Sequence, residues 1–272
     1  MSDGRAVNES SKRRLVSVIF DGTFEGFLCT LNAYYHGNIF PDALLMESEY
    51  QQSIGANYFN VTTDFALAKK ISEAIADKIS EDALYTAINA FQNSEAEKYL
   101  DIYRYLITGF KVGASVDGYN HLDYIRRVKK LASLSSREAM HLRQFLRFIE
   151  TADGTLYAEI TPMQDSLVLL LDHFRDRFKY QRWIIHDTTH GKAAIYDSKQ
   201  CIIVPAPNRP IFENSEQETY VQKLWQMFHK TVAVEQRLNK KLQRQHLPMK
   251  YRKNMTEFAL DIPVVKKIGK RR

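Results

Sequence analysis

The sequence contains very little cysteine. Only Cys29 and Cys201 occur in 272 residues, they lie far apart, and neither belongs to a CxxC pair. Clustered cysteines hold structural zinc and iron–sulfur groups, so this kind of site is excluded. The scarcity of thiols fits a reducing compartment, and we expect a cytoplasmic protein.

Long apolar runs and flexible linkers are also missing. No stretch approaches eighteen uninterrupted apolar residues, so we expect no transmembrane helix and no membrane partner. Residues 1–14 are polar and lack the apolar core of a signal peptide, which predicts a disordered tail. There is no internal repeat and no long Pro/Ser/Gly linker, so we expect one domain over 15–258 and a basic tail over 259–272.

The common nucleotide and hydrolase motifs are absent. The sequence has no GxGxxG, no GxxxxGK[ST], no GxSxG, no HExxH and no HxE followed by PCxxC. These absences remove dinucleotide-binding, P-loop, α/β-hydrolase, zinc-protease and zinc-deaminase chemistry. They leave other enzyme classes open, and we expect no cofactor.

Positive charge is concentrated at the C-terminal end. Residues 237–272 contain twelve Lys or Arg and two acids, a net charge of +10, whereas the whole chain is only +6. Residues 1–236 therefore carry −4. A dense block of positive charge attracts polyanions by releasing counterions from a phosphate backbone.

Hydrophobic periodicity predicts an α+β fold: a helix-rich single domain with a small, mainly antiparallel sheet. Helical spacing dominates between residues 63 and 149, and alternation begins at 155. Ser80 predicts a helix start, as do two Ser-x-x-Glu boxes, Ser135–Glu138 and Ser215–Glu218, and Pro248 predicts the start of a short last helix. The predicted strands are 15–20, 155–161, 182–187, 192–197 and 201–204, with 43–47 as a further possibility.

Two acidic residues, Asp21 and Glu25, lie at a strand-to-helix junction. Paired carboxylates there can bind a metal or transfer protons, but the simpler interpretation is that Asp21 or Thr23 caps the helix and Glu25 complements its dipole. Three other carboxylates would converge with them only if strand 15–20 joins the 155–204 sheet. The full set of weak catalytic candidates is Asp21, Glu25, Glu138, Glu159 and Asp187.

Histidines flank the turn after the 182–187 strand. His186, Asp187 and His190 would form a metal site if a third ligand from elsewhere joined them, although turn histidines are usually just exposed. We therefore predict no metal.

Arginines on two helices are candidates for an anion site. Arg143 and Arg147 share a helix face, where like charges require an anion. A structural ion pair with Asp165 or Asp172 is the simpler explanation, and a phosphate is the alternative. Arg175 and Arg177 lie in a mixed-charge segment that suits either a solvated face or an extension of the same surface.

The basic block mixes cations with amide and aromatic side chains, which suits phosphate and base contacts. A solvated helix face is the alternative. Leu224, Trp225 and Phe228 precede the block at helical spacing and are predicted to be core. The candidate nucleic-acid contacts in the block are Arg237, Asn239, Lys240, Lys241, Arg244, Lys250, Tyr251, Arg252 and Lys253.

Several strings in this order carry a family resemblance. They are FDGTFEGFL at 20–28, REA at 137–139, FLRF at 145–148, LYAEITP at 156–162, HFRDRF at 173–178, WIIHD at 183–187, LW at 224–225, RLN at 237–239 and LPMKYRKNMTEF at 247–258. In this arrangement the chain resembles a bacterial family of probable DNA-metabolism proteins, a domain of unknown function.

The resemblance implies DNA repair or modification. Members of that family are typically encoded beside a putative DNA-repair radical S-adenosylmethionine protein, and a related domain is sometimes fused to a uracil-DNA-glycosylase-like domain. The expected partners are therefore DNA and such a radical S-adenosylmethionine protein. The family supplies no reaction.

Three functions follow as hypotheses. The first is a nucleic-acid-binding accessory protein for DNA repair, in which the helical part of the basic block sets the binding geometry. The second is a hydrolase or lyase acting on damaged nucleotides. The third is a protein-interaction module whose basic block docks on an acidic partner.

Overall fold

The structure is a computed structural model that describes residues 16–37, 40–50, 57–210, 213, 215–232 and 239–258. The chain forms two compact units, Met1–Ser133 and Leu134–Arg272. Each unit has its own cluster of buried apolar side chains. The α+β class predicted from the sequence is confirmed. The predicted limits of the domain and its tails stay a prediction, since 1–14 and 259–272 lie outside the described residues.

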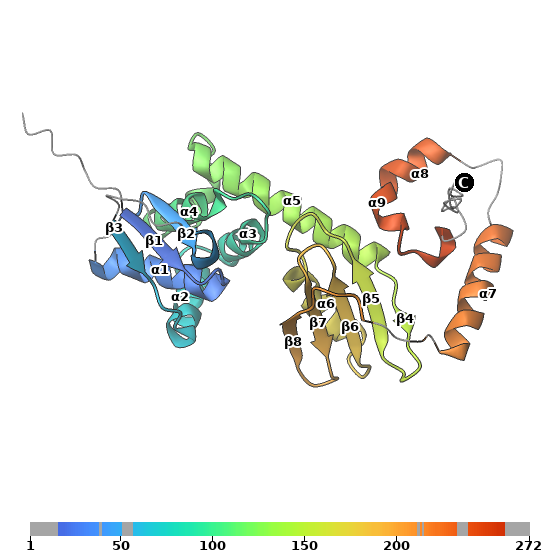
Figure 1. Ribbon diagram of the computed structural model, residues 1–272. Helices are drawn as coiled ribbons and strands as arrows, with labels where there is room; N and C mark the ends of the chain where they lie inside the picture. Colours follow the sequence, from blue (N-terminus) through green and yellow to red (C-terminus); the bar gives the residue numbers. More distant parts are fainter. Residues whose placement is uncertain are drawn as a thin grey trace, which may run out of the picture. The chain divides into compact units, whose positions relative to one another are not determined.

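Unit 1 contains a parallel sheet of three strands. β1 (Val16–Phe20) lies in the centre, with β2 (Ala43–Met46) on one side and β3 (Asn57–Asn60) on the other. The idea that strand 15–20 extends the 155–204 sheet is wrong, because both edges of β1 are occupied by these strands (Figure 1). The sequence analysis anticipated β2 but not β3, whose residues NYFN show no apolar alternation.

Helices complete unit 1. They are α1 (Phe24–Gly37), α2 (Phe65–Lys78), α3 (Glu81–Phe91) and α4 (Lys98–Val112), with short 3-10 turns η1 (Glu47–Glu49) and η2 (Gly113–Gly118). Asp64 caps α2, and Ser80 caps α3 as the sequence predicts. The core of unit 1 contains packed aromatic rings. The ring centroid of Phe20 lies 5.1 Å from that of Tyr99 and 6.1 Å from that of Phe27.

One long helix, α5 (Asp123–Phe145), replaces two predicted helices. The predicted start at the Ser135–Glu138 box is wrong, because Ser135 lies fully buried inside this helix. The segment contains neither glycine nor proline, so nothing in the backbone interrupts the helix. Its first part belongs to unit 1 and its last part to unit 2.

Unit 2 contains a mixed sheet of five strands in the order β4 (Ile149–Glu150), β5 (Leu156–Ile160), β6 (Trp183–Asp187), β7 (Lys192–Tyr196) and β8 (Cys201–Pro205). All pairs are antiparallel except β5 and β6, which are parallel. The predicted strands from 155 to 204 are therefore confirmed within a residue or two. The connection between the parallel strands carries η3 (Val168–Leu170) and α6 (Leu171–Arg177).

The pleat of this sheet sorts its side chains. Successive residues on a strand face opposite sides. Ile185 and Ala194 pack with Leu142 of α5 and Phe174 of α6 in one buried cluster, so α5 and α6 cover that face (Figure 1). The residues of β5 and β6 that alternate with the core-facing ones, such as Glu159, point to the other face of the sheet.

The C-terminal part of unit 2 is helical. It contains α7 (Glu216–Val232), α8 (Lys240–His246), α9 (Met249–Arg252) and η5 (Thr256–Phe258). The predicted start at Ser215–Glu218 is confirmed, because the Glu218 N–H donates to Ser215 Oγ at 3.0 Å. Pro248 also begins α9 as predicted. Among the helices of the described ranges, none has the length and apolar character needed to span a bilayer.

Candidate functional site

Three of the four predicted arginines of the α5–α6 region line a single pocket in unit 2. The pocket has a volume of about 550 Å³, and Arg143, Arg147 and Arg177 all face it. They come from the last turn of α5, the residues just after it, and the last turn of α6. The pocket therefore gathers positive charge from segments about thirty residues apart in the sequence.

The arginines are held in defined positions. Arg147 Nη1 donates to the carbonyl of Gln144 at 3.1 Å, and its Nη2 donates to Glu257 at 3.0 Å. Arg143 donates to the carbonyl of Leu169. Arg177 lies 5.7 Å from the Phe178 ring, within range of a cation–π contact. An ion pair for Arg147 was one of the two predicted alternatives, but its partner is Glu257, because Asp165 pairs with Lys192 and Asp172 with Arg175.

Aromatic side chains form much of the pocket wall. The ring centroid of Phe148 lies 5.4 Å from that of Phe174 and 5.1 Å from that of Phe178, both in edge-to-face geometry. Trp225 lines the pocket from α7. Aromatic rings can stack on a nucleotide base, and positively charged side chains can neutralise its phosphate, so the pocket combines the two features that nucleotide binding uses.

The apolar residues of α7 are not core. Leu224, Trp225 and Phe228 are 44%, 43% and 56% exposed, so the prediction that they are buried is wrong. Helical spacing identifies the face that they share but not what covers it. The Trp225 indole is nevertheless held in place, because its Nε1 donates to Glu257 at 3.3 Å and its ring stacks on Phe228 at 5.8 Å.

A second, smaller pocket adjoins the first. Its volume is about 210 Å³, and it shares Arg147, Gln222 and Thr256 with the larger pocket. Glu159, Arg209 and Lys253 also line it. Arg209 Nε lies 3.1 Å from the Glu159 carboxylate, so one of its cations is already partly neutralised.

Comparison with known proteins places this arrangement in a family. A family model described as a domain of unknown function, DUF4130, matches residues 96–257, which include every residue of the two pockets. This chain belongs to the DUF4130 family. No curated protein and no solved structure matches the chain. The family resemblance seen in the sequence is thereby confirmed at the level of a domain of unknown function.

The predicted basic contacts of the DUF4130 domain separate into two groups. Lys250 pairs with Glu138 at 2.7 Å, Tyr251 is buried, and Arg252 donates to the Leu247 carbonyl at 3.2 Å. Lys250 and Tyr251 hold the C-terminal segment to the rest of unit 2, whereas Arg252 bonds within that segment. Burial opposes the charge on Lys250, but the bond to Glu138 outweighs it and raises the Lys250 pKa.

The second group is free of such roles. Lys240, Lys241 and Arg244 of α8 are exposed, and so is Lys253. Asn239, predicted to contact nucleic acid, instead caps α8, its Oδ1 accepting the Leu242 N–H at 3.0 Å. Arg237 and the tail residues 266–272 lie outside the described residues.

The predicted carboxylates do not converge. Within unit 2, Glu159 and Asp187 are offset by one position in the β5–β6 register. Because successive residues on a strand face opposite sides, these two carboxylates lie on opposite faces of the sheet. Glu138 accepts the Met163 and Gln164 N–H groups at 3.1 and 2.7 Å, so it holds a loop against α5. Since β1 is not part of this sheet, the condition for the catalytic hypothesis is not met.

In unit 1, Asp21 holds Thr23, the residue that caps α1. Asp21 accepts the Thr23 N–H at 2.9 Å and the Thr63 hydroxyl at 2.7 Å, and Thr23 Oγ1 in turn accepts the Gly26 N–H. Although partial burial works to raise the Asp21 pKa, these hydrogen bonds together lower it. Glu25 is exposed in the first turn of α1. The capping interpretation of this junction is confirmed.

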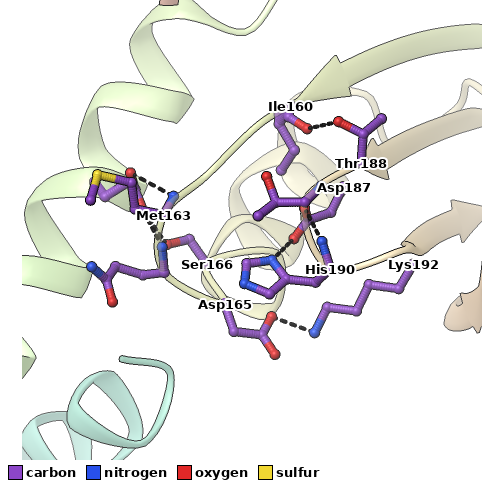
Figure 2. Close-up of polar contacts among 11 residues, drawn as sticks. Ile160, Met163, Asp165, Ser166, Asp187, Thr188, His190 and Lys192 are labelled. Atoms are coloured by element: carbon purple, nitrogen blue, oxygen red, sulfur yellow. Dashed lines mark hydrogen bonds and ion pairs between the residues drawn. The ribbon is translucent and has the colours of Figure 1, made fainter. Parts of the chain in front are cut away.

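Asp187 and His190 form a polar cluster with a third residue, Asp165, that the sequence did not place there. Figure 2 shows His190 bonded to Asp187, with Asp165 and Lys192 beside them. Asp187 is fully buried, and its Oδ2 lies 2.6 Å from His190 Nδ1. Because a carboxylate only accepts, this nitrogen carries the proton. The bond raises the His190 pKa above its ordinary value, although partial burial works against it.

This cluster has the ligand types of a metal site but is filled by its own groups. Ligand atoms of Asp165, Asp187 and His190 lie within 4.8 Å of one another. Lys192 pairs with Asp165, however, and a metal ion would have to displace its ammonium group. His186 does not join them, since it faces the other side of the sheet and lies 2.9 Å from the Tyr157 hydroxyl.

Proposed function

We propose that this protein binds nucleic acid through unit 2, as an accessory protein of DNA repair or modification. The observation that carries the proposal is the convergence of Arg143, Arg147 and Arg177 on one pocket with aromatic walls. Arginine pairs with phosphate through two parallel N–H donors, and aromatic rings stack on bases of any sequence.

The exposed cations of α8 are a second part of the proposed DNA contact. Lys240, Lys241 and Arg244 make no ion pair among those found in the described residues. Their charges remain available for DNA phosphates, and such contacts supply affinity without sequence preference.

The finer part of the proposal rests on the family resemblance. We propose a radical S-adenosylmethionine protein of DNA repair as the partner, because relatives of this kind are encoded beside one. In this arrangement the partner catalyses the reaction and the present chain binds the DNA.

Salt-dependent binding tests the proposal. Fluorescence anisotropy with labelled single- and double-stranded DNA should show affinity at low salt that falls steeply as salt rises. Replacing Lys240, Lys241 and Arg244 by alanine should reduce the slope of log K against log salt by about 2, since each phosphate contact contributes about 0.7 to 0.9. A matched control replaces three exposed lysines of unit 1, Lys69, Lys70 and Lys130. Absence of DNA binding at low salt, or equal losses in both triple variants, would contradict the proposal.

Protein interaction is a second candidate function, favoured by the outer face of α7. Leu224 and Phe228 form an apolar stripe at helical spacing and are 44% and 56% exposed. If this stripe binds the proposed partner, the purified proteins should co-elute after nuclease treatment. Leu224→Asp should then abolish co-elution while Lys223→Asp, on the same helix, should not.

A further inference from the structure

We infer that the arginine pocket takes one unstacked nucleobase of a DNA single strand, and that the adjoining smaller pocket takes its phosphate. This inference rests on the proposed function and specifies the ligand for the same site. It starts from the shape of the larger pocket. A volume of about 550 Å³ lies within the range of small-molecule sites, so the pocket has room for a nucleobase.

Trp225 has the properties of a stacking platform. It is 43% exposed, yet its ring is oriented by the bond to Glu257 and by the stacked Phe228 ring. Because the exposed ring is already held in one orientation, its side chain loses little conformational entropy when a base stacks on it. The Phe178 ring, with Arg177 against it, contributes a second aromatic surface from α6.

Amide groups line the same pocket between the rings. Gln144 and Gln181 contribute from the α5 end and from the turn after α6. Amides both donate and accept, so they match the hydrogen-bonding edge of a base. Gln222 is already committed, since it donates to Glu218 at 2.6 Å.

The smaller pocket suits a phosphate. Arg147, Arg209 and Lys253 surround it against one carboxylate, Glu159. Arg147 lines both pockets, so it lies where a base and its own phosphate would meet. Its carboxylate partner, Glu257, also holds Trp225, which couples the position of the cation to that of the ring.

A paired base cannot occupy this site. Bases in a duplex are stacked and hydrogen-bonded, and bringing one into a pocket costs the energy of unstacking and unpairing. The site therefore favours a single strand, or an unpaired nucleotide within a duplex, over a continuous duplex.

Three labelled DNAs test this inference: a single strand, a blunt duplex, and the same duplex with one unpaired nucleotide. The single strand and the bulged duplex should bind more tightly than the blunt duplex. Binding should also protect tryptophan fluorescence from acrylamide, and the protected signal reports on Trp225 because Trp183 is fully buried. Trp225→Ala should weaken single-strand binding about tenfold, which is the scale of one base stacked on an aromatic ring.

Matched variants separate this inference from the proposed function. Tyr220→Ala removes an exposed aromatic residue from the same helix outside the pocket and should leave affinity unchanged. Arg177→Ala should weaken single-strand binding more than duplex binding. Equal affinity for all three DNAs, together with no effect of Trp225→Ala, would overturn the pocket inference. If the Lys240/Lys241/Arg244 variant still weakened binding in that case, the proposed function would stand.

Discussion

Arg147 and Glu257, 110 positions apart in the sequence, are joined by a hydrogen-bonded ion pair of 3.0 Å. Only 6% of the Glu257 side chain is exposed, against 33% for Arg147. The pair ties η5 to the end of α5, and the second carboxylate oxygen accepts the Trp225 indole N–H. One buried acid thus positions both a cation and an aromatic ring of the proposed nucleotide site.

Removal of this acid should affect both stability and binding. Glu257→Ala leaves two donors without their acceptor, and we expect a loss of about 2 kcal/mol in the free energy of unfolding. Urea denaturation measures it. The control is Glu97→Ala, whose 3.8 Å contact with Arg127 is exposed and should contribute less than about 0.5 kcal/mol. Equal losses in the two variants would show that the Arg147–Glu257 pair has no special role.

Glu138 should be more important for stability than for any reaction. Glu138→Ala removes the acceptor of the Met163 and Gln164 N–H groups and the partner of Lys250, and we expect a loss of about 3 kcal/mol. Hydrogen exchange at those two amides should accelerate in the variant. Lys250→Met, which leaves the backbone bonds intact, should cost less and should not change their exchange. Unchanged protection of both amides in Glu138→Ala would refute this role.

Gly26 is required by the packing around Asp21. A Cβ atom at position 26 would lie 2.2 Å from Asp21 Oδ1 and 2.7 Å from Thr63 Oγ1. Alanine favours helices by about 1 kcal/mol over glycine, but here the clash should dominate and destabilise unit 1 by about 1 to 3 kcal/mol. Gly118→Ala is the control, because nothing lies within 4 Å of its added Cβ. A thermal shift assay that finds Gly26→Ala as stable as the natural chain would contradict the structure at this junction.

The Asp187–His190 bond should make stability depend on pH. The folded pKa of His190 is raised above its unfolded value, so its stabilising contribution is complete below the unfolded pKa, about 6.5. The contribution disappears as pH rises through the folded pKa. His190→Gln should therefore destabilise the protein more at about pH 5 than at about pH 9. His246→Gln, at an exposed position of α8, serves as the control. A loss that is the same at both pH values would rule out the charged pair.

The local pattern of the sequence determined most elements of unit 2. Alternation between turn residues predicted β5 to β8, because a strand with one buried face shows its period in the sequence itself. Capping residues likewise located the starts of α3, α7 and α9. The DUF4130 resemblance was also visible in the sequence, since it depends on short strings and their order.

Tertiary structure decided which of these elements and side chains meet. The chain's parallel pairs, β1 with β2 and β3 and β5 with β6, join strands that are separate in sequence, and no local period reports such pairing. For the same reason the sequence identified Arg143, Arg147 and Arg177 as candidates without bringing them together. It also read Trp225 as core, because helical spacing shows that apolar residues share a face but not whether anything packs on it. Burial and long-range contact are properties of the folded chain, and the pocket depends on both.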